Sequence, residues 1–141
     1  MKRFLSLVCL LAVFATLAAV PSYAQEATPR GSNELSSYGA YCTKTSSTTV
    51  VVSYQVLGTD ALDEIGVNTV KVQYSSDGVN WTTAKTFQKS VYTSMVDYNT
   101  SMHGGTLTAT APSGKQYRAY VEFYGEKDGN FTERSYYTTI I

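Results

Sequence analysis

Short runs that alternate apolar and polar residues make up most of the chain from residue 49 onward, and this two-residue period is that of β-strands. The clearest run is 49–57, whose apolar side chains share one face: Val50, Val52, Tyr54 and Val56. Val51 breaks the alternation, which indicates a central strand with both faces partly covered. No convincing amphipathic helix is apparent, because the best candidate, 58–66, is bounded by glycines and long enough for one turn at most.

Turn-forming residues separate the runs and predict β-hairpins. Runs 67–74 and 80–83 flank the dipeptide Asp77-Gly78, a strong hairpin signal because glycine accepts a positive φ at low cost. A second hairpin is predicted around Gly129. The remaining strands are expected at 38–42, 89–98, 106–111, 116–124 and 131–141.

About seven short strands in little more than a hundred residues predict an all-β domain over 35–141. The expected architecture is an antiparallel sandwich of two sheets, with a small barrel of the OB type as the alternative. The preceding segment, 25–34, is polar and turn-rich, so we expect it to be a flexible leader.

The N-terminal segment has the organisation of an export signal. Lys2 and Arg3 precede a long apolar run that ends at a proline, and Ser22 and Ala24 supply a small-x-small cleavage site. A membrane anchor is the alternative, but the helix breaker and the cleavage triplet favour export. We therefore expect residues 1–24 to be a signal peptide that is cleaved after Ala24, and the protein to be secreted.

The charge balance bears on the choice of partner. Removal of Lys2 and Arg3 takes the basic residues from 11 to nine, against 11 acidic ones. Nucleic acid is not an expected partner, because no basic stripe is present to follow a phosphate backbone. No second apolar run is long enough to cross a bilayer, so we expect no membrane span in the mature chain. The oligomeric state stays open.

Few residues are candidates for chemistry. Cys42 is the only cysteine beyond the export signal and His103 is the only histidine, so we expect Cys42 to be buried and not to form a catalytic pair. Asp60, Asp63 and Glu64 lack the ordered spacing of a calcium loop and are expected to form a solvated loop. The sequence thus predicts no catalytic site, no metal site and no cofactor.

Two stretches resemble fibronectin type III and related immunoglobulin-like domains. The sequence Gln-Tyr-Arg-Ala-Tyr-Val at 116–121 follows a Pro-Ser-Gly turn, as in the sixth strand of those domains. This resemblance implies that the hydroxyl of Tyr117 bonds back to nearby backbone. The run 70–81 is similar to their C–C′ hairpin, although Trp81 lies after the turn and not in the preceding strand, and the disulfide of true immunoglobulin domains is absent.

The layout is also similar to that of uncharacterised small exported proteins of Gram-positive bacteria. The shared elements are Asp-Glu-Ile-Gly-Val at 63–67, Ser-Ser-Asp-Gly-Val-Asn-Trp-Thr at 75–82 and Tyr-Arg-Ala-Tyr-Val at 117–121. This resemblance implies bacterial export and supplies no activity.

Tyrosine is the most unusual feature of the composition, with 12 residues in the chain. Tyr120 and Tyr124 are predicted on the outward face of their strand, and either Tyr136 or Tyr137 adds a ring on that side, whichever register holds. Tyrosine rings stack on sugars and anchor protein interfaces. Tyrosine is also a good strand residue in its own right, which is the competing explanation.

These observations lead us to expect a non-catalytic binding module that recognises a surface glycan or an extracellular protein through the four tyrosines. The alternative is a structural protein of the envelope or extracellular matrix that self-associates through its edge strands. A small hydrolase ranks last, because no nucleophile–base pair or carboxylate cleft is recognisable.

Overall fold

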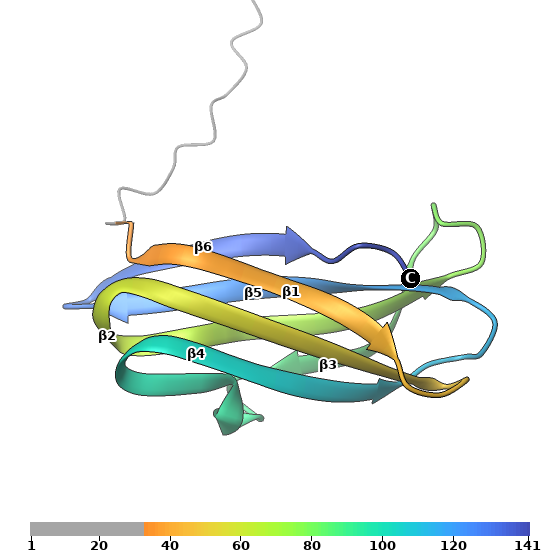
Figure 1. Cartoon of the computed structure of the whole chain (residues 1–141), viewed down its shortest axis with the longest axis horizontal. Helices are drawn as coiled ribbons and strands as arrows, with labels where there is room; N and C mark the ends of the chain where they lie inside the picture. Colours follow the sequence, from red (N-terminus) through yellow and green to blue (C-terminus); the bar gives the residue numbers. More distant parts are fainter. Residues whose placement is uncertain (1–32) are drawn as a thin grey trace, which may run out of the picture.

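A computed structural model describes residues 33–141, so the predicted export signal and most of the predicted leader lie outside the described residues. The described chain is all-β, with a single 3₁₀ turn and no α-helix (Figure 1). Its elements are β1 (Leu35–Lys44), β2 (Thr49–Ser75), β3 (Thr82–Gln88), η1 (Thr93–Met95), β4 (Val96–Thr110), β5 (Gln116–Lys127) and β6 (Asn130–Tyr137).

All six strands belong to one antiparallel sheet, and β2 is the strand that joins its parts (Figure 1). Residues 49–57 of β2 pair with β1 on one side and with β4 on the other. Residues 67–75 of β2 pair with β3 and β5, and β5 pairs in turn with β6. The sheet therefore curls into two walls: a first wall of β1, the start of β2 and β4, and a second wall of β3, the end of β2, β5 and β6.

The curl lies in the middle of β2, where the pairing is irregular. The register with β4 shifts between Leu57 and Leu62, and the register with β5 shifts between Val67 and Thr69. Such bulges bend a strand and increase its twist. Gly66 is required here, because a Cβ at this position would lie 2.2 Å from the carbonyl oxygen of Met95. The expectation of a loop or helical turn over 58–66 is therefore wrong.

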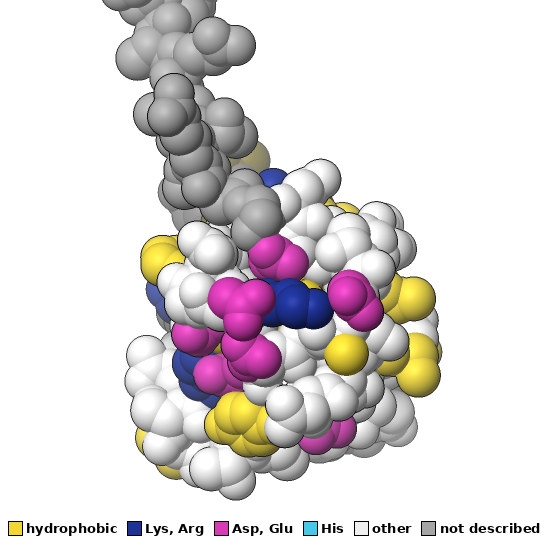
Figure 2. All heavy atoms as spheres, turned by 90° about the vertical axis from the view of Figure 1, so that its left-hand side faces the viewer, with side chains coloured by type: hydrophobic (Ala, Val, Ile, Leu, Met, Phe, Trp, Pro, Cys, Tyr) yellow, Lys and Arg dark blue, Asp and Glu magenta, His cyan; other side chains and the backbone are white. Residues whose placement is uncertain are grey.

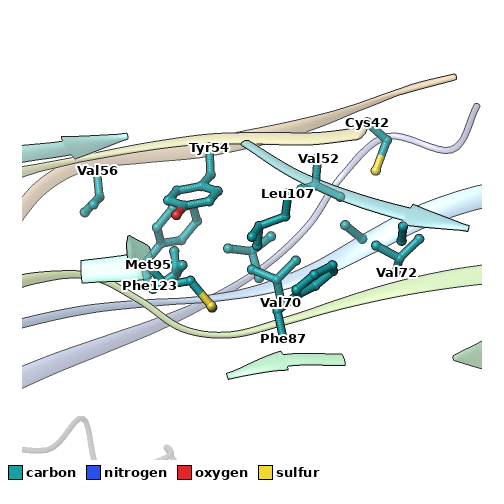
Figure 3. Close-up of a cluster of buried hydrophobic side chains, with 14 of the residues drawn as sticks. Cys42, Val52, Tyr54, Val56, Val70, Val72, Phe87, Met95, Leu107 and Phe123 are labelled. Carbon is teal, nitrogen blue, oxygen red and sulfur yellow. The ribbon is translucent and has the colours of Figure 1, made fainter. Parts of the chain in front are cut away.

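One hydrophobic core fills the space between the walls. Figure 3 shows Val52 and Tyr54 of the first wall on one side of this core and Val70 of the second wall on the other. The apolar face predicted for 49–57 is confirmed, since its four side chains are at most 6% exposed. The face predicted for 116–124 is confirmed as well, with these residues at most 1% exposed: Tyr117, Ala119, Val121 and Phe123.

The hairpin predicted at Asp77-Gly78 is confirmed, because β2 turns there and returns as β3 with Tyr74 opposite Thr82. Gly78 has φ +73°, and Asp77 Oδ1 accepts hydrogen bonds from the backbone N–H groups of Val79 and the next residue. These bonds hold the pKa of Asp77 far below its usual range.

Three other strand predictions are corrected. The prediction of a strand over 89–98 is wrong in its first part, which forms a turn and η1, and β4 starts only at Val96. The runs 49–57 and 67–74 are one continuous strand, and 106–110 is the end of the same strand β4 that begins at Val96, so the described residues form six strands where about seven were expected. β6 ends at Tyr137, although the backbone groups of Ile141 still exchange two 3.0 Å hydrogen bonds with Tyr117.

The turn before β5 contains the contact that the fibronectin resemblance implied. The hydroxyl of Tyr117 donates to the carbonyl oxygen of Pro112, and its ring is buried. The prediction that this hydroxyl bonds back to nearby backbone is therefore confirmed.

Candidate functional site

The outward side of the second wall, which we call the tyrosine face, holds three of the four predicted site residues. Tyr120 and Tyr124 lie at alternate positions of β5 that point away from the core. Tyr137 of β6 pairs with Tyr120, and their ring centroids are 5.2 Å apart. Tyr136 points inward, with its ring 6.4 Å from that of Phe123. The register between β5 and β6 thus places Tyr137 on the tyrosine face and Tyr136 against the core.

Arg118 is held between two aromatic rings at one end of the tyrosine face. Its guanidinium carbon lies 4.2 Å from the ring centroid of Trp81 and 4.4 Å from that of Tyr137. Its Nε also donates a 2.9 Å hydrogen bond to Oε1 of Gln73. Because the ring of Tyr137 in turn packs at a tilt on that of Tyr120, these side chains form a continuous row of planar groups from the β2–β3 turn across β5 and β6.

Sequence reasoning did not single out Arg118 and Trp81 as site residues. The available signal was weak: Arg118 lies two residues before Tyr120 in an alternating strand, which puts both on one face. The position of Trp81 depends on how the β2–β3 hairpin packs beside β5. The alternation of residues within one strand does not predict this packing.

A shallow groove of about 240 Å³ runs beside these rings. Its lining combines rings, amides and charges: Thr69, Lys71, Gln73, Gln88, Tyr120, Glu122 and Tyr137. A second hollow of about 480 Å³ shares Thr69 and Gln88 with it and continues toward Tyr124 and Phe131. Together the two hollows form one groove along β5. Since Tyr120 and Tyr124 are four residues apart on this strand, the groove follows it for about 13 Å.

Tyr124 belongs to the tyrosine face but is only 9% exposed. The ammonium group of Lys89 lies 3.8 Å from its ring centroid, and Phe131 stacks on it with centroids 6.3 Å apart. Its hydroxyl donates to Glu126. Burial, and then this hydrogen bond to a carboxylate, raise the pKa of Tyr124 far above its usual value. Tyr124 therefore supports the floor of the second hollow, whereas Tyr137 is 53% exposed and available for contact.

The polar groups of the groove are tied into one hydrogen-bond network. The hydroxyl of Tyr120 lies 3.0 Å from Oγ of Ser135 and donates to Glu122 at 3.3 Å. Asn68, the bulged residue of β2, donates from Nδ2 to Glu133 at 2.7 Å and to Glu122 at 3.3 Å. These contacts hold the carboxylates in place beside the rings, which preorganises hydrogen-bond acceptors along the groove.

Cys42 and His103 are not brought together. They pair with Val52 and Val56 on opposite sides of β2, about 13 Å apart along that strand. Cys42 is buried as expected, beside the hydroxyl of Thr138 at 3.4 Å, and burial raises the pKa of its thiol. Burial lowers the pKa of His103. Among residues 33–141, neither group lies beside the activating partner that nucleophilic catalysis requires.

The acidic stretch 60–64 is part of the curl of β2. Figure 2 shows acidic side chains around a basic one at this end of the molecule. Each of the three predicted acidic residues has a different partner: Asp60 pairs with Lys127 at 3.1 Å, Asp63 accepts from the backbone N–H of Asp128 at 2.8 Å, and Glu64 pairs with Lys89 at 2.7 Å. Across residues 33–141 there is no group of three or more His, Cys, Asp or Glu side chains suited to a metal ion.

No protein-family model, curated protein or solved structure matches the chain. Residues 33–141 contain no helix with the length and hydrophobicity that a membrane span requires. The tyrosine face itself is therefore the basis for assigning a function.

Proposed function

We propose that the chain is an exported, non-catalytic module that binds an uncharged surface glycan through the tyrosine face. The observation that carries this proposal is the row formed by Trp81, Arg118, Tyr137 and Tyr120 beside a groove lined with amides and hydroxyls. Sugar rings offer apolar faces that stack on aromatic rings, and their hydroxyl groups need fixed donors and acceptors alongside.

The charge of the groove favours an uncharged ligand. Lys71 and Lys89 are balanced by Glu122 and Glu133 among the residues that line the two hollows. Lys89 is paired with a carboxylate, and the guanidinium of Arg118 is enclosed by rings. The two lysines would attract an anionic polymer, but the two carboxylates at the same surface would repel it.

The proposed architecture is a fibronectin type III-like sandwich, related to small exported proteins of Gram-positive bacteria. Its support is the division of the strands into β1–β2–β4 and β3–β2–β5–β6, together with the Tyr117–Pro112 contact at the start of β5. Trp81 departs from that architecture, since it packs on Arg118 on the outward side. We also propose that residues 1–24 are removed on export and that the protein is secreted.

Retention on insoluble polysaccharides tests the binding proposal. Residues 25–141, which contain every described strand, are applied to cell-wall preparations, chitin and β-glucan, beside an acidic polysaccharide as the charged comparison. Tyr137→Ala is the test variant and Tyr98→Ala the matched control, because these tyrosines are 53% and 59% exposed and Tyr98 lies on β4.

We expect retention on an uncharged polysaccharide that falls at least about tenfold in Tyr137→Ala, the loss typical of an aromatic contact residue. Tyr98→Ala is expected to be retained like the unchanged chain. Equal retention of both variants, or retention on the acidic polymer alone, contradicts the proposal. Absence of retention on every polysaccharide overturns the glycan assignment and directs the search to an extracellular protein.

A further inference from the structure

The outer strands of the two walls differ in how they are protected against pairing with another chain. In the second wall, β6 carries Glu133 and Arg134 at its centre and β3 carries Lys85. Charged side chains on an edge strand discourage the addition of another strand. In the first wall, residues 35–43 of β1 contain no charged side chain. Within the described residues β1 pairs only with β2, so its other side is an edge.

A hollow adjoins the centre of this strand. It has a volume of about 490 Å³ and is lined by residues 37–41 of β1, by four residues of β2 and by Tyr136 of β6. Gly39 lies at the centre of the β1 segment, where a Cβ would meet no atom within 4 Å. Tyr38 and Tyr41 flank it and are 38% and 61% exposed. Uncharged backbone, open space and exposed rings thus coincide at one place.

We propose that two copies of this chain pair through β1, antiparallel to each other, about a two-fold axis at Gly39. In this register Tyr38 faces Ala40 of the second copy, and Tyr41 faces its Ser37. Each large ring therefore meets a small side chain, and the same contacts occur twice, as a two-fold interface requires. The paired strands satisfy backbone groups that otherwise face water on both copies.

The edge on β4, where residues 98–110 contain no Asp, Glu, Lys or Arg, does not provide an equivalent head-to-tail partner for β1. Both strands are antiparallel to β2, so they run in the same direction. Stacking copies by translation would therefore pair β1 with β4 in parallel, which is slightly less stable per residue than antiparallel pairing. The two-fold arrangement also closes after two copies, whereas head-to-tail addition continues into a fibre.

The pairing also has a geometric consequence for glycan binding. This consequence rests on the proposed function, whereas the pairing itself does not. Residues opposite each other in an antiparallel pair point to the same side of the sheet. The second walls of both copies therefore lie on one side of the joined first walls, and the two tyrosine faces point in a similar direction. A long glycan could then contact both copies and gain affinity by avidity.

Charge substitutions at the axis test the pairing. Gly39→Lys and Gly39→Asp each place two like charges opposite each other in the dimer, and the open space at Gly39 accommodates either side chain in the monomer. Thr83→Lys, on the exposed edge strand β3, adds the same charge elsewhere and is the control. The mass of residues 25–141 is followed over a concentration series by sedimentation equilibrium, with circular dichroism to verify folding.

We expect a weak dimer for the unchanged chain and for Thr83→Lys, and a dissociation constant raised at least about tenfold in each Gly39 variant. A mixture of the Lys and Asp variants is expected to form a heterodimer. Gly39→Cys should cross-link to itself on mild oxidation, because Cα atoms opposite each other in antiparallel strands lie within disulfide range. A monomer at every concentration, a dimer that persists in Gly39→Lys, or an open series of oligomers overturns the proposal, and none of these results bears on glycan retention.

Discussion

The outward sides of the two walls are built from the same kind of strand but differ in chemistry. The first wall presents what we call the hydroxyl face, whose successive rows are Thr43–Val51–Thr108 and Tyr41–Ser53–Thr106. These rows contain no charged side chain and only one ring. The tyrosine face of the second wall carries rings, cations and carboxylates that contact one another.

This difference indicates which face is organised for recognition. Threonine and serine suit an exposed strand for reasons of propensity alone, so the hydroxyl face needs no functional explanation. The enclosure of Arg118 between two rings and the bulge that aims Asn68 at two carboxylates are specific arrangements that propensity does not produce. The tyrosine face is therefore the surface to which binding is assigned.

The largest expected effect comes from removing the curl that separates the two faces. Gly66→Val places a side chain against the carbonyl oxygen of Met95 and should lower the free energy of unfolding by about 3 kcal/mol. Urea denaturation measures this loss, with Gly39→Ala as the control because a Cβ there meets nothing. An unchanged unfolding midpoint in Gly66→Val would show that the curl tolerates a side chain.

A smaller effect is expected when one cation is removed from each wall. Arg118→Ala breaks two ring contacts and the bond to Gln73, so we expect a loss of about 1 kcal/mol in stability and at least about a tenfold loss in glycan affinity. Lys44→Ala removes a single contact, 5.4 Å from the ring of Tyr117, and should leave binding unchanged. Equal binding by the two variants would contradict the assignment of the tyrosine face.

A third effect is confined to high pH and comes from the interior of the first wall. Burial raises the pKa of Tyr54 to about 12. The unfolded chain releases this proton near the usual tyrosine value of about 10, so stability is constant below that pH and falls between about 10 and 12. Urea unfolding at stepped pH should show a shallower fall in Tyr54→Phe. An identical dependence of stability on pH in both proteins would mean that Tyr54 does not contribute to the loss of stability at high pH.

The smallest effect is expected on the hydroxyl face. The double change Thr106→Ala/Thr108→Ala removes two exposed hydroxyl groups and should alter the free energy of unfolding by no more than about 0.5 kcal/mol. Glycan retention should also stay the same. A clear loss of retention in this variant would indicate that the two faces have been assigned the wrong way round.

The alternation of apolar and polar residues made much of the fold predictable. The buried faces of 49–57 and 116–124 and the turn at Asp77 follow from local pattern and turn chemistry, and the structure contains all three. The curl of β2 was not predictable from the sequence, because a segment with Asp60 and Asp63 between two glycines has the composition of a loop. Their strand conformation is maintained by pairing with β4 and by the contacts of Lys127 and Asp128, which are distant in sequence.

The candidate site was predictable only in part, for a related reason. Alternation placed Tyr120 and Tyr124 on one side of β5, but the choice of Tyr137 over Tyr136 depends on the β5–β6 register. The burial of Tyr124 comes from Lys89, in a segment that was expected to be a strand and forms a turn. Contacts between strands thus decide which tyrosines are accessible.

A nuclear magnetic resonance titration of labelled residues 25–141 with soluble, uncharged cell-wall oligosaccharides tests whether binding takes place on the tyrosine face. It reports both faces in one experiment. We expect chemical-shift changes at Arg118, Tyr120 and Tyr137 and along the adjoining groove, with Thr106 and Thr108 unaffected. Shift changes centred on the hydroxyl face, or on the β1 edge around Gly39, would contradict the assignment of binding to the tyrosine face.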